Sequence, residues 1–323
     1  MLSKDRFFPS DPTTRGIARR LFQEVEHLPL ICPHGHTDPS WFAQNQAYSD
    51  PAELLIVPDH YILRMLVSQG IDHIKLGVHP IDGTVGQADS REVWRLFAAN
   101  CHLFRSTPVR HWMDHTLETL FGIEAPLNAS MADHSYDVIA EALATDAFKP
   151  RALYENFNIE VLATTDSCLD DLSHHRAIAD SGWGGRVIPT YRPDIVTNPD
   201  GVGFAAGLKT LGDITGEDTT TWQGLLRAHQ ARRRQFIAMG TTATDHGHPS
   251  ALTCDLSLQD CEALYDAILT GKASADQNEQ FRGQMLTEMA RMRLDDGLVM
   301  QIHVGSVRNH SASIFDRFGP DKG

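Results

Sequence analysis

The chain lacks an excess of positive charge, paired cysteines and long apolar runs. Its formal net charge is −14 at pH 7, which argues against nucleic acid or an anionic membrane as a main partner. The five cysteines are an odd, scattered set without a C-x-x-C pair, as expected for reduced thiols in the cytoplasm. No apolar run reaches membrane-spanning length, and the N-terminus has no signal-peptide apolar core. We therefore expect a soluble, cytoplasmic protein that binds neither nucleic acid nor a membrane.

Two motifs are absent, and their absence limits the fold classes and the kinds of metal site that the sequence allows. No glycine-rich phosphate fingerprint follows a predicted strand, which favours a barrel over a dinucleotide-binding sheet. No lysine lies in residues 241–249, so a carbamylated lysine that bridges two metals is not available there. One metal ion is therefore expected rather than two. The acidic net charge does not exclude an anionic small substrate, because a few arginines can reverse the field in one pocket.

The order of the predicted elements indicates an α/β protein. Of the 323 residues 41% are hydrophobic, which is enough for one large α/β domain or two smaller ones. Helical patterns dominate residues 40–157, and strands are expected to begin near residues 28, 159, 186, 241 and 298 with helices between them. This alternation predicts a single (β/α)8 TIM-type barrel domain over residues 1–323, with a helical insertion over 40–157 after strand 1. A closed barrel needs eight strands, so either strands in the helical region escape detection or the barrel is truncated after the fifth strand.

Local signals mark the ends of several helices. Asp11 followed by Pro12 is typical of a helix start, and so is Thr107 followed by Pro108. Asp89-x-x-Glu92 resembles a capping box, and Gly122 is a typical helix end.

The most distinctive stretch is His34-Gly-His36, which follows a short apolar run. If residues 30–36 are strand-like, both imidazoles project to the same side and can share one ion of zinc, manganese, iron or nickel. With 17 histidines in 323 residues, about one His-x-His pair is expected by chance. A second pair, His246-Gly-His248, does occur in loop-like sequence. The alternative is therefore an ordinary pair of loop histidines.

Two further residues follow predicted strands directly. His303 ends the last predicted strand, where it could join the two histidines as a metal ligand or be a buried, hydrogen-bonded histidine. Asp245 ends the strand before it and could be a base, a ligand or only the cap of the following turn.

Arginines near strand ends could recognise a carboxylate. Arg186, Arg192 and Arg308 can each fork onto a carboxylate with two charge-assisted hydrogen bonds, or form a salt bridge with a rim acid such as Asp194. A polar cluster, Asp59-His60-Tyr61 with Arg64, lies in the helical region and also fits a surface helix start. We expect three other groups to be solvated or capping residues: His174 with His175, His246 with His248, and Arg232 to Arg234.

Taken together, these segments resemble uronate isomerase (glucuronate isomerase), a family of the amidohydrolase superfamily. The matching motifs are Cys32-Pro-His34-Gly-His36-Thr-Asp38-Pro39, Asp59-His60-Tyr61-x-x-Arg64, Ala163-Thr-Thr165-Asp166, Pro189-Thr-Tyr191-Arg192-Pro193-Asp194, Asp245-His246-Gly247 and Met300-Gln-Ile-His303-x-Gly305-x-x-Arg308-Asn309. They follow the family order across nearly the whole chain, and the Arg-Pro-Asp and His-Tyr-x-x-Arg elements are far more specific than His-x-His.

The resemblance implies a distorted (β/α)8 barrel that interconverts D-glucuronate with D-fructuronate and D-galacturonate with D-tagaturonate. It implies one divalent metal, commonly zinc, on His34 and His36 with His303 at or near it. The residues expected to hold the open-chain hexuronate are His60, Tyr61, Arg64, Arg186, Arg192 and Arg308. Asp245, Tyr61 and His303 are the expected catalytic residues: Asp245 as acid/base and Tyr61 as a proton shuttle to oxygen.

The sequence also departs from the family pattern. An aspartate that ends the eighth strand and an arginine two residues later complete the family's site, and neither is found here. We therefore expect a chain that resembles the N-terminal two-thirds of the family. Two alternatives follow: an inactive remnant of the enzyme, or another metal-dependent amidohydrolase. Assembly into a homo-oligomer is left open.

Overall fold

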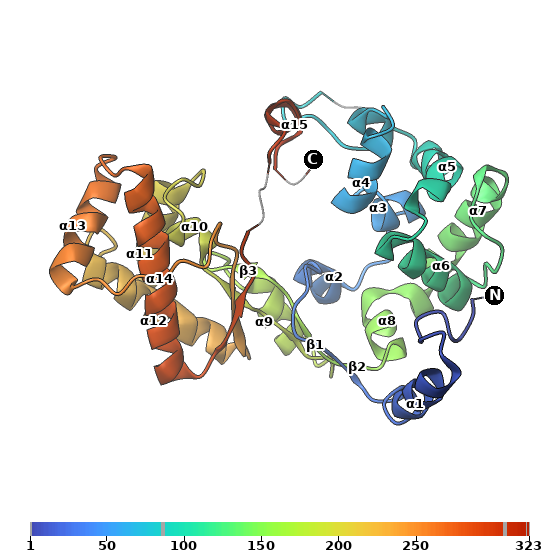
Figure 1. Cartoon of the computed structure of the whole chain (residues 1–323), viewed down its shortest axis with the longest axis horizontal. Helices are drawn as coiled ribbons and strands as arrows, with labels where there is room; N and C mark the ends of the chain where they lie inside the picture. Colours follow the sequence, from blue (N-terminus) through green and yellow to red (C-terminus); the bar gives the residue numbers. More distant parts are fainter. Residues whose placement is uncertain (1, 85–87, 306–308, 321, 323) are drawn as a thin grey trace. The chain divides into compact units, whose positions relative to one another are not determined.

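Helices and parallel strands divide between two units in the computed structural model of the chain (Figure 1), which describes residues 2–84, 88–305, 309–320 and 322. Unit 1 comprises Met1–Pro29, Asn45–Asn158 and Arg308–Gly323. Unit 2 comprises Leu30–Gln44 and Ile159–Val307.

Among its described residues, unit 1 contains helices joined by loops and no strand. Its helices are α1 (Pro12–Gln23), α3 (Pro51–Leu55), α4 (His60–Val67), α5 (Ser90–Asn100), α6 (Pro108–Phe121), α7 (Ala132–Leu143), α8 (Pro150–Asn156) and α15 (Ala312–Phe318), with short 3-10 turns at His73–Leu76, Cys101–Phe104, Ala129–Met131 and Asp146–Phe148. The predicted starts at Asp11 and Thr107 are confirmed, because both side chains cap their helices. Gly122 ends α6 with a φ of 67°, a left-handed conformation that favours glycine.

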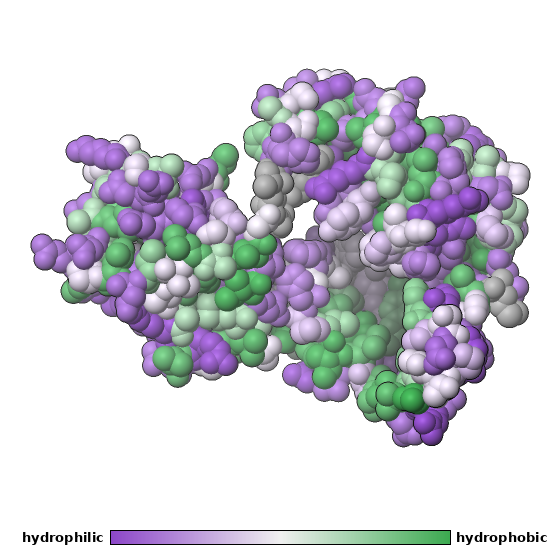
Figure 2. Space-filling view, in the orientation of Figure 1, coloured by the Kyte–Doolittle hydropathy of each residue, from purple (hydrophilic) through white to green (hydrophobic). Residues whose placement is uncertain are grey.

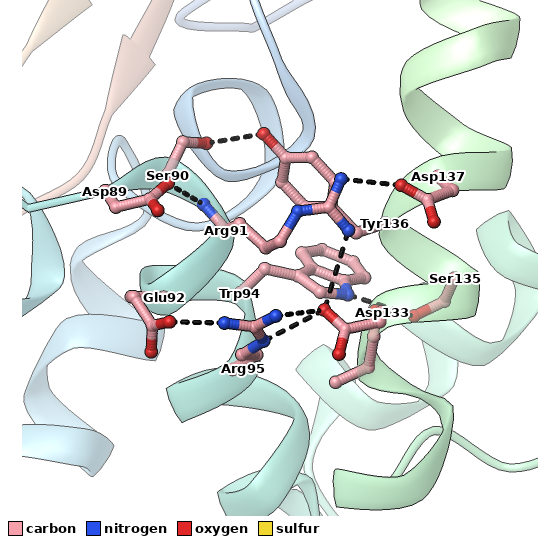
Figure 3. A network of polar contacts seen from close by, with 11 residues as sticks. Asp89, Ser90, Arg91, Glu92, Trp94, Arg95, Asp133, Ser135, Tyr136 and Asp137 are labelled. Carbon is pink, nitrogen blue, oxygen red and sulfur yellow. Dashed lines mark hydrogen bonds and ion pairs between the residues drawn. The ribbon is translucent and has the colours of Figure 1, made fainter.

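The contact between α5 and α7 combines a buried hydrogen bond with an exposed ion-pair network (Figure 3). The Trp94 indole is fully buried and donates to Ser135 Oγ at 3.0 Å. Arg91 and Arg95 both reach Asp133 on α7, Arg91 at 3.5 Å and Arg95 at 2.7 Å. Asp89 caps α5, but Glu92 pairs with Arg95, so the predicted capping box is wrong in its second half.

Unit 2 carries the described strands, all of them parallel. The strands are β1 (Leu30–Cys32), β2 (Ile159–Ala163), β3 (Asp166–Ser167), β4 (Val187–Ile188), β5 (Tyr191–Arg192), β6 (Ala243–His246) and β7 (Val299–Ile302). They form one sheet in the order β1-β2-β4 and a second in the order β3-β5-β6-β7. Backbone hydrogen bonds such as Thr190 N to Thr164 O join the two sheets where β2 continues into β3 and β4 into β5.

These strands match the five predicted strand positions, and their parallel pairing confirms an α/β arrangement with crossovers. A closed barrel is not confirmed, since the described strands form three- and four-stranded sheets. The first strand is also shorter than predicted. It ends at Cys32, because only Leu30–Cys32 pairs with β2 and the two histidines follow in a loop.

Helices pack against the sheets of unit 2 around a second apolar core. These helices are α2 (Pro39–Gln44), α9 (Ser173–Asp180), α10 (Asp194–Thr197), α11 (Phe204–Thr215), α12 (Trp222–Ala238), α13 (Leu258–Leu269) and α14 (Ala275–Asp296). The core gathers Tyr191, Trp222, Phe236, Tyr265 and Phe281.

The predicted solvated face of α12 is wrong for two of its three arginines. Arg233 is buried and forms a bidentate ion pair with Asp296, at 2.6 and 2.9 Å. Arg232 is buried too and donates to the carbonyl of Cys168 at 2.7 Å. Both guanidinium groups therefore connect α12 to its surroundings within unit 2 instead of facing water.

The outer strands of unit 2 expose apolar side chains. Ile31 on β1 is 63% exposed and Val299 on β7 is 55% exposed. In the space-filling view, hydrophobic surface covers the region of β1 and β2 (Figure 2). None of the helices in the described residues has the length and apolar character needed to cross a membrane.

Candidate active site

The loop after β1 brings His34 and His36 side by side, although the strand stops before them. Their ring centroids are 5.2 Å apart. Gly35 between them leaves little room, because an added Cβ would lie 3.3 Å from the carbonyl oxygen of Ala163 on β2. Thr165 Oγ1 donates to the Gly35 carbonyl at 2.8 Å, which fixes the loop against the end of β2.

Strand β6 and the residue directly after its neighbour β7 supply Asp245 and His303 to the same place. The His303 ring lies 5.9 Å from the His34 ring, centroid to centroid. Asp245 Oδ1 lies 2.9 Å from His303 Nδ1 and 4.0 Å from His34 Nδ1. We call His34, His36, Asp245 and His303 the histidine–aspartate cluster. It unites four predicted site residues in one part of unit 2.

The carboxylate of Asp245 is the most unusual group of the cluster. Its side chain is 0% exposed, and neither oxygen has a hydrogen-bond partner among the described residues. The His303 and Arg192 nitrogens lie within ion-pair distance, but their angles do not make hydrogen bonds. A buried charge left in this state costs stability unless a further group satisfies it.

Arg192 and Asp194 form the edge of the cluster. Arg192 Nε donates to Asp194 Oδ2 at 2.8 Å, and its Nη1 lies 3.4 Å from Asp245 Oδ2. The Gly247 amide donates to Asp194 Oδ1 at 3.2 Å. A Cβ added at Gly247 would require neighbouring side chains to shift, since it would lie 2.7 Å from Arg192 Nη2 and 3.1 Å from His303 Nε2.

A buried hydrogen-bonded chain runs from Asp166 through Thr164 to His175 in unit 2. Thr164 Oγ1 donates to Asp166 Oδ2 at 2.7 Å and lies 2.9 Å from His175 Nε2. Burial raises the pKa of Asp166 to about 6 and lowers the pKa of His175 to about 4. The prediction that His175 is a solvated or capping residue is wrong, because its side chain is buried in this chain.

The second His-x-His pair is also buried, contrary to the prediction. His246 is 0% exposed and His248 is 4% exposed, since residue 246 belongs to β6 rather than to a loop. Thr244 Oγ1 lies 2.8 Å from His246 Nε2, and burial lowers the pKa of His246 to about 3. The His246 ring is therefore a neutral part of the interior at ordinary pH.

The remaining predicted residues belong to other elements of the chain or fall outside the described residues. His60, Tyr61 and Arg64 belong to α4 of unit 1, where Asp59 caps the helix and the His60 and Tyr61 rings lie 4.2 Å apart. Arg186 precedes β4, at the end of the sheet opposite to the carboxyl ends of the strands, and lies 4.0 Å from Glu160. Arg308 lies outside the described residues.

The donor types of the cluster fit a divalent cation. Imidazole nitrogens and a carboxylate are suitable ligands for zinc and similar ions, and the unsatisfied Asp245 oxygens are free to interact with a cation. Within the part of the chain that the structure describes, no three such groups already converge as a formed metal site. The fit therefore rests on the donor set and the buried carboxylate.

Sequence reasoning missed Gln301, which contacts the cluster from β7. Its Oε1 lies 2.8 Å from His34 Nδ1, and its Nε2 donates to the Pro33 carbonyl at 2.8 Å. The signal was present, because alternate residues of a strand share a side and Gln301 precedes His303 by two.

Comparison with known proteins places the chain among sugar-acid isomerases. A family model described as glucuronate isomerase matches residues 6–323. The uronate isomerases of Rhizobium meliloti (strain 1021) and Xanthomonas campestris pv. campestris (strain B100) are 55% and 53% identical over 323 residues, which is all of this chain and 69% of each relative.

Solved structures agree with these matches. The crystal structure of glucuronate isomerase from Caulobacter crescentus has a TM-score of 0.97 and 50% identity, and the match covers all of this chain and 67% of that one. Uronate isomerase from Thermotoga maritima has a TM-score of 0.90 at 26% identity, and the match covers 68% of that chain.

The matches confirm one prediction and give another no support. They extend over the whole chain and do not bear out the interpretation of a truncated, inactive remnant. They confirm the predicted resemblance in sequence and in fold. The chain therefore belongs to the uronate isomerase (glucuronate isomerase) family.

Proposed function

We propose that the histidine–aspartate cluster catalyses the aldose–ketose isomerisation of hexuronates, D-glucuronate to D-fructuronate and D-galacturonate to D-tagaturonate. Family membership supports the reaction class. The placement of the site rests on one observation: the Asp245 carboxylate is fully buried and has no hydrogen bond among the described residues. Its Oδ1 lies 2.9 Å from His303 Nδ1 and 4.0 Å from His34 Nδ1. Strained or unsatisfied polar groups of this kind concentrate at functional sites.

His34, His36 and His303 would hold one divalent cation, with zinc as the proposed metal. When bound, such a cation supplies a Lewis acid for the carbonyl and hydroxyl oxygens of the sugar. The histidines must be neutral to donate a lone pair, and the Nδ1 contact of His34 with Gln301 leaves Nε2 of that ring for the purpose.

Asp245 is the proposed base. Isomerisation moves a proton from C2 to C1 of the open-chain sugar through an enediol, and a carboxylate can take up that proton and return it. Burial excludes water from Asp245, so it exchanges few protons with solvent and presents an oxygen that is not already hydrogen-bonded. Tyr61 is the proposed proton shuttle to oxygen.

Arginine is the proposed partner of the substrate's C6 carboxylate. Arg192 lies beside the cluster, but Asp194 already occupies its Nε, so only the outer guanidinium nitrogens remain for a substrate. His60, Arg64 and Arg308 remain predictions from the family resemblance. The placement of Arg186, before β4 and near Glu160, gives its predicted role no support.

We further propose that the described strands belong to a barrel of the amidohydrolase type. Their parallel pairing and the site residues after β1, in β6 and after β7 support this proposal. The cytoplasmic location predicted from the scattered cysteines stays a proposal, consistent with five free thiols.

A substrate comparison tests the proposed function. The zinc-loaded chain is incubated with D-glucuronate, D-galacturonate and, as the hydrolase alternative, simple esters and amides. Formation of the 2-keto sugar acids is expected, with at least a hundredfold loss in Asp245→Asn, because one base contributes about 10²–10⁴ to the rate. Ester or amide hydrolysis without ketose formation would identify the chain as a different amidohydrolase.

A further inference from the structure

Gln301 joins β7 to the loop after β1 through two side-chain hydrogen bonds. It lies opposite Asp245 in the parallel β6–β7 pair. Its carboxamide spans 268 positions of sequence to Pro33, with Nε2 and the Pro33 carbonyl 2.8 Å apart. The other end of the same carboxamide meets His34 Nδ1, also at 2.8 Å.

The chemistry of these partners fixes the orientation of both groups. The Pro33 carbonyl can only accept, so the Gln301 NH2 group must face it and Oε1 must face His34. An amide oxygen can only accept, so His34 Nδ1 carries the proton. In the neutral ring, Nε2 is then the nitrogen with a free lone pair.

Asp245 is a second acceptor in the neighbourhood of His34 Nδ1. Its Oδ1 lies 4.0 Å from that nitrogen, beyond hydrogen-bond distance, whereas the Gln301 oxygen lies at 2.8 Å. His34 is 38% exposed, so burial alone does not hold its ring. The hydrogen bond from Nδ1 to Gln301 is thus the described contact that can select one tautomer.

We propose that Gln301 is a positioning residue that holds His34 as its Nδ1–H tautomer and aims Nε2 at a divalent cation. This inference rests on the proposed function for the identity of the ligand, but the tautomer itself is a property of the metal-free protein. Histidine ligands generally need such an outer partner, and its removal typically costs 10–100-fold in metal affinity.

The first measurement is the tautomer of His34 in metal-free protein, from the ring nitrogen shifts of 15N-histidine-labelled samples. The wild type is expected to show a protonated Nδ1 and a bare Nε2. Gln301→Leu removes the acceptor and is expected to give a mixture of tautomers. Gln301→Glu keeps an acceptor and is expected to retain the wild-type tautomer.

The second measurement is the zinc dissociation constant of the same variants by competition with a chelator. Gln301→Leu is expected to weaken zinc binding about 10–100-fold. Gln280→Leu makes the same exchange at an exposed position of α14 and is expected to leave the constant unchanged.

The two measurements separate failure of this inference from failure of the proposed function. A wild-type His34 that carries its proton on Nε2, or an unchanged tautomer in Gln301→Leu, would overturn the positioning role. A wild type that shows the expected tautomer but binds no zinc would instead contradict the proposed function. If Gln301→Leu does not fold, Gln301→Met provides the same loss of acceptor with a flexible side chain of similar length.

Discussion

Replacement of Asp245 by asparagine should stabilise the metal-free protein while it removes function. The carboxylate is 0% exposed, and its oxygens have no hydrogen-bond partner among the described residues. An unsatisfied buried group costs about 1–3 kcal/mol, and more when it is charged. Asparagine has nearly the same shape but no charge, so its burial costs less.

Opposing terms limit the size of this gain. The substitution loses the attraction of Asp245 to Arg192 at 3.4 Å and to His303 at 2.9 Å. Arg192 keeps its hydrogen bond to Asp194, so its charge does not become unpaired. We expect a net gain of about 1–2 kcal/mol in the free energy of unfolding, which corresponds to a few degrees in melting temperature for a domain of this size.

The assay is urea unfolding of chelator-treated protein at pH 7.5, with and without added zinc. Zinc should stabilise the wild type by about 2.7 kcal/mol at a hundredfold excess over its dissociation constant, and should stabilise Asp245→Asn less. Asp194→Asn is the matched control in the same neighbourhood. Both Asp194 oxygens accept hydrogen bonds, so this variant should lose about 1–2 kcal/mol. If Asp245→Asn also loses stability without metal, Arg192 and His303 already compensate the buried carboxylate. That result would contradict the prediction that Asp245 destabilises the metal-free protein.

Three further predictions follow from particular contacts. Gly247→Ala should lower activity at least tenfold with little change in global stability, because the added Cβ displaces the side-chain ends of Arg192 and His303. The control Gly16→Ala, with open space around its Cβ inside α1, should leave activity unchanged and raise stability by up to about 1 kcal/mol. An unchanged kcat/KM in Gly247→Ala would show that the site tolerates the shift. Ser135→Ala should cost about 1–3 kcal/mol in urea unfolding, because the buried Trp94 indole N–H loses its acceptor, whereas Ser10→Ala at an exposed position should be neutral. Stability should fall as the pH drops below about 6.5, because burial lowers the pKa of His229 and His246 to about 3 and of His175 to about 4. Below pH 6.5 these histidines are protonated in the unfolded chain but not in the native state. The free energy of unfolding therefore falls by roughly 1.4 kcal/mol per pH unit for each histidine. Asp166 opposes this loss, since burial raises its pKa to about 6 and the native state gains a proton between about pH 6 and 3.8. A free energy of unfolding that stays constant between pH 7 and 5 would contradict the assigned burial of the histidines.

The sequence predicted the strand positions of unit 2 because short apolar runs there give way to polar residues at the carboxyl end. Asp245 and His303 were recognisable for this reason, and the structure brings them together with His34 and His36. Gln301 escaped because a glutamine on a strand resembles any solvent-facing polar residue. Strand alternation places Gln301 on the same side as His303, but its partner His34 lies 267 positions away, and no local pattern reveals that contact.

Burial was the property that the sequence predicted least well. Arg232 and Arg233 look like a solvated run, but each finds long-range partners that compensate its charge inside unit 2. His246 and His248 look like loop residues, because Gly247 between them suggests a turn. The local residue types are compatible with either environment, and tertiary packing decides between them.

The most direct test of the account is the metal dependence of isomerisation. Chelator-treated protein is mixed with D-glucuronate, and the conversion to D-fructuronate is followed by NMR before and after one equivalent of zinc is added, with His34→Ala measured in parallel. We expect no conversion without zinc, conversion by the reconstituted wild type, and a loss of at least a hundredfold in His34→Ala. Equal conversion with and without metal, or an unaffected His34→Ala, would contradict it.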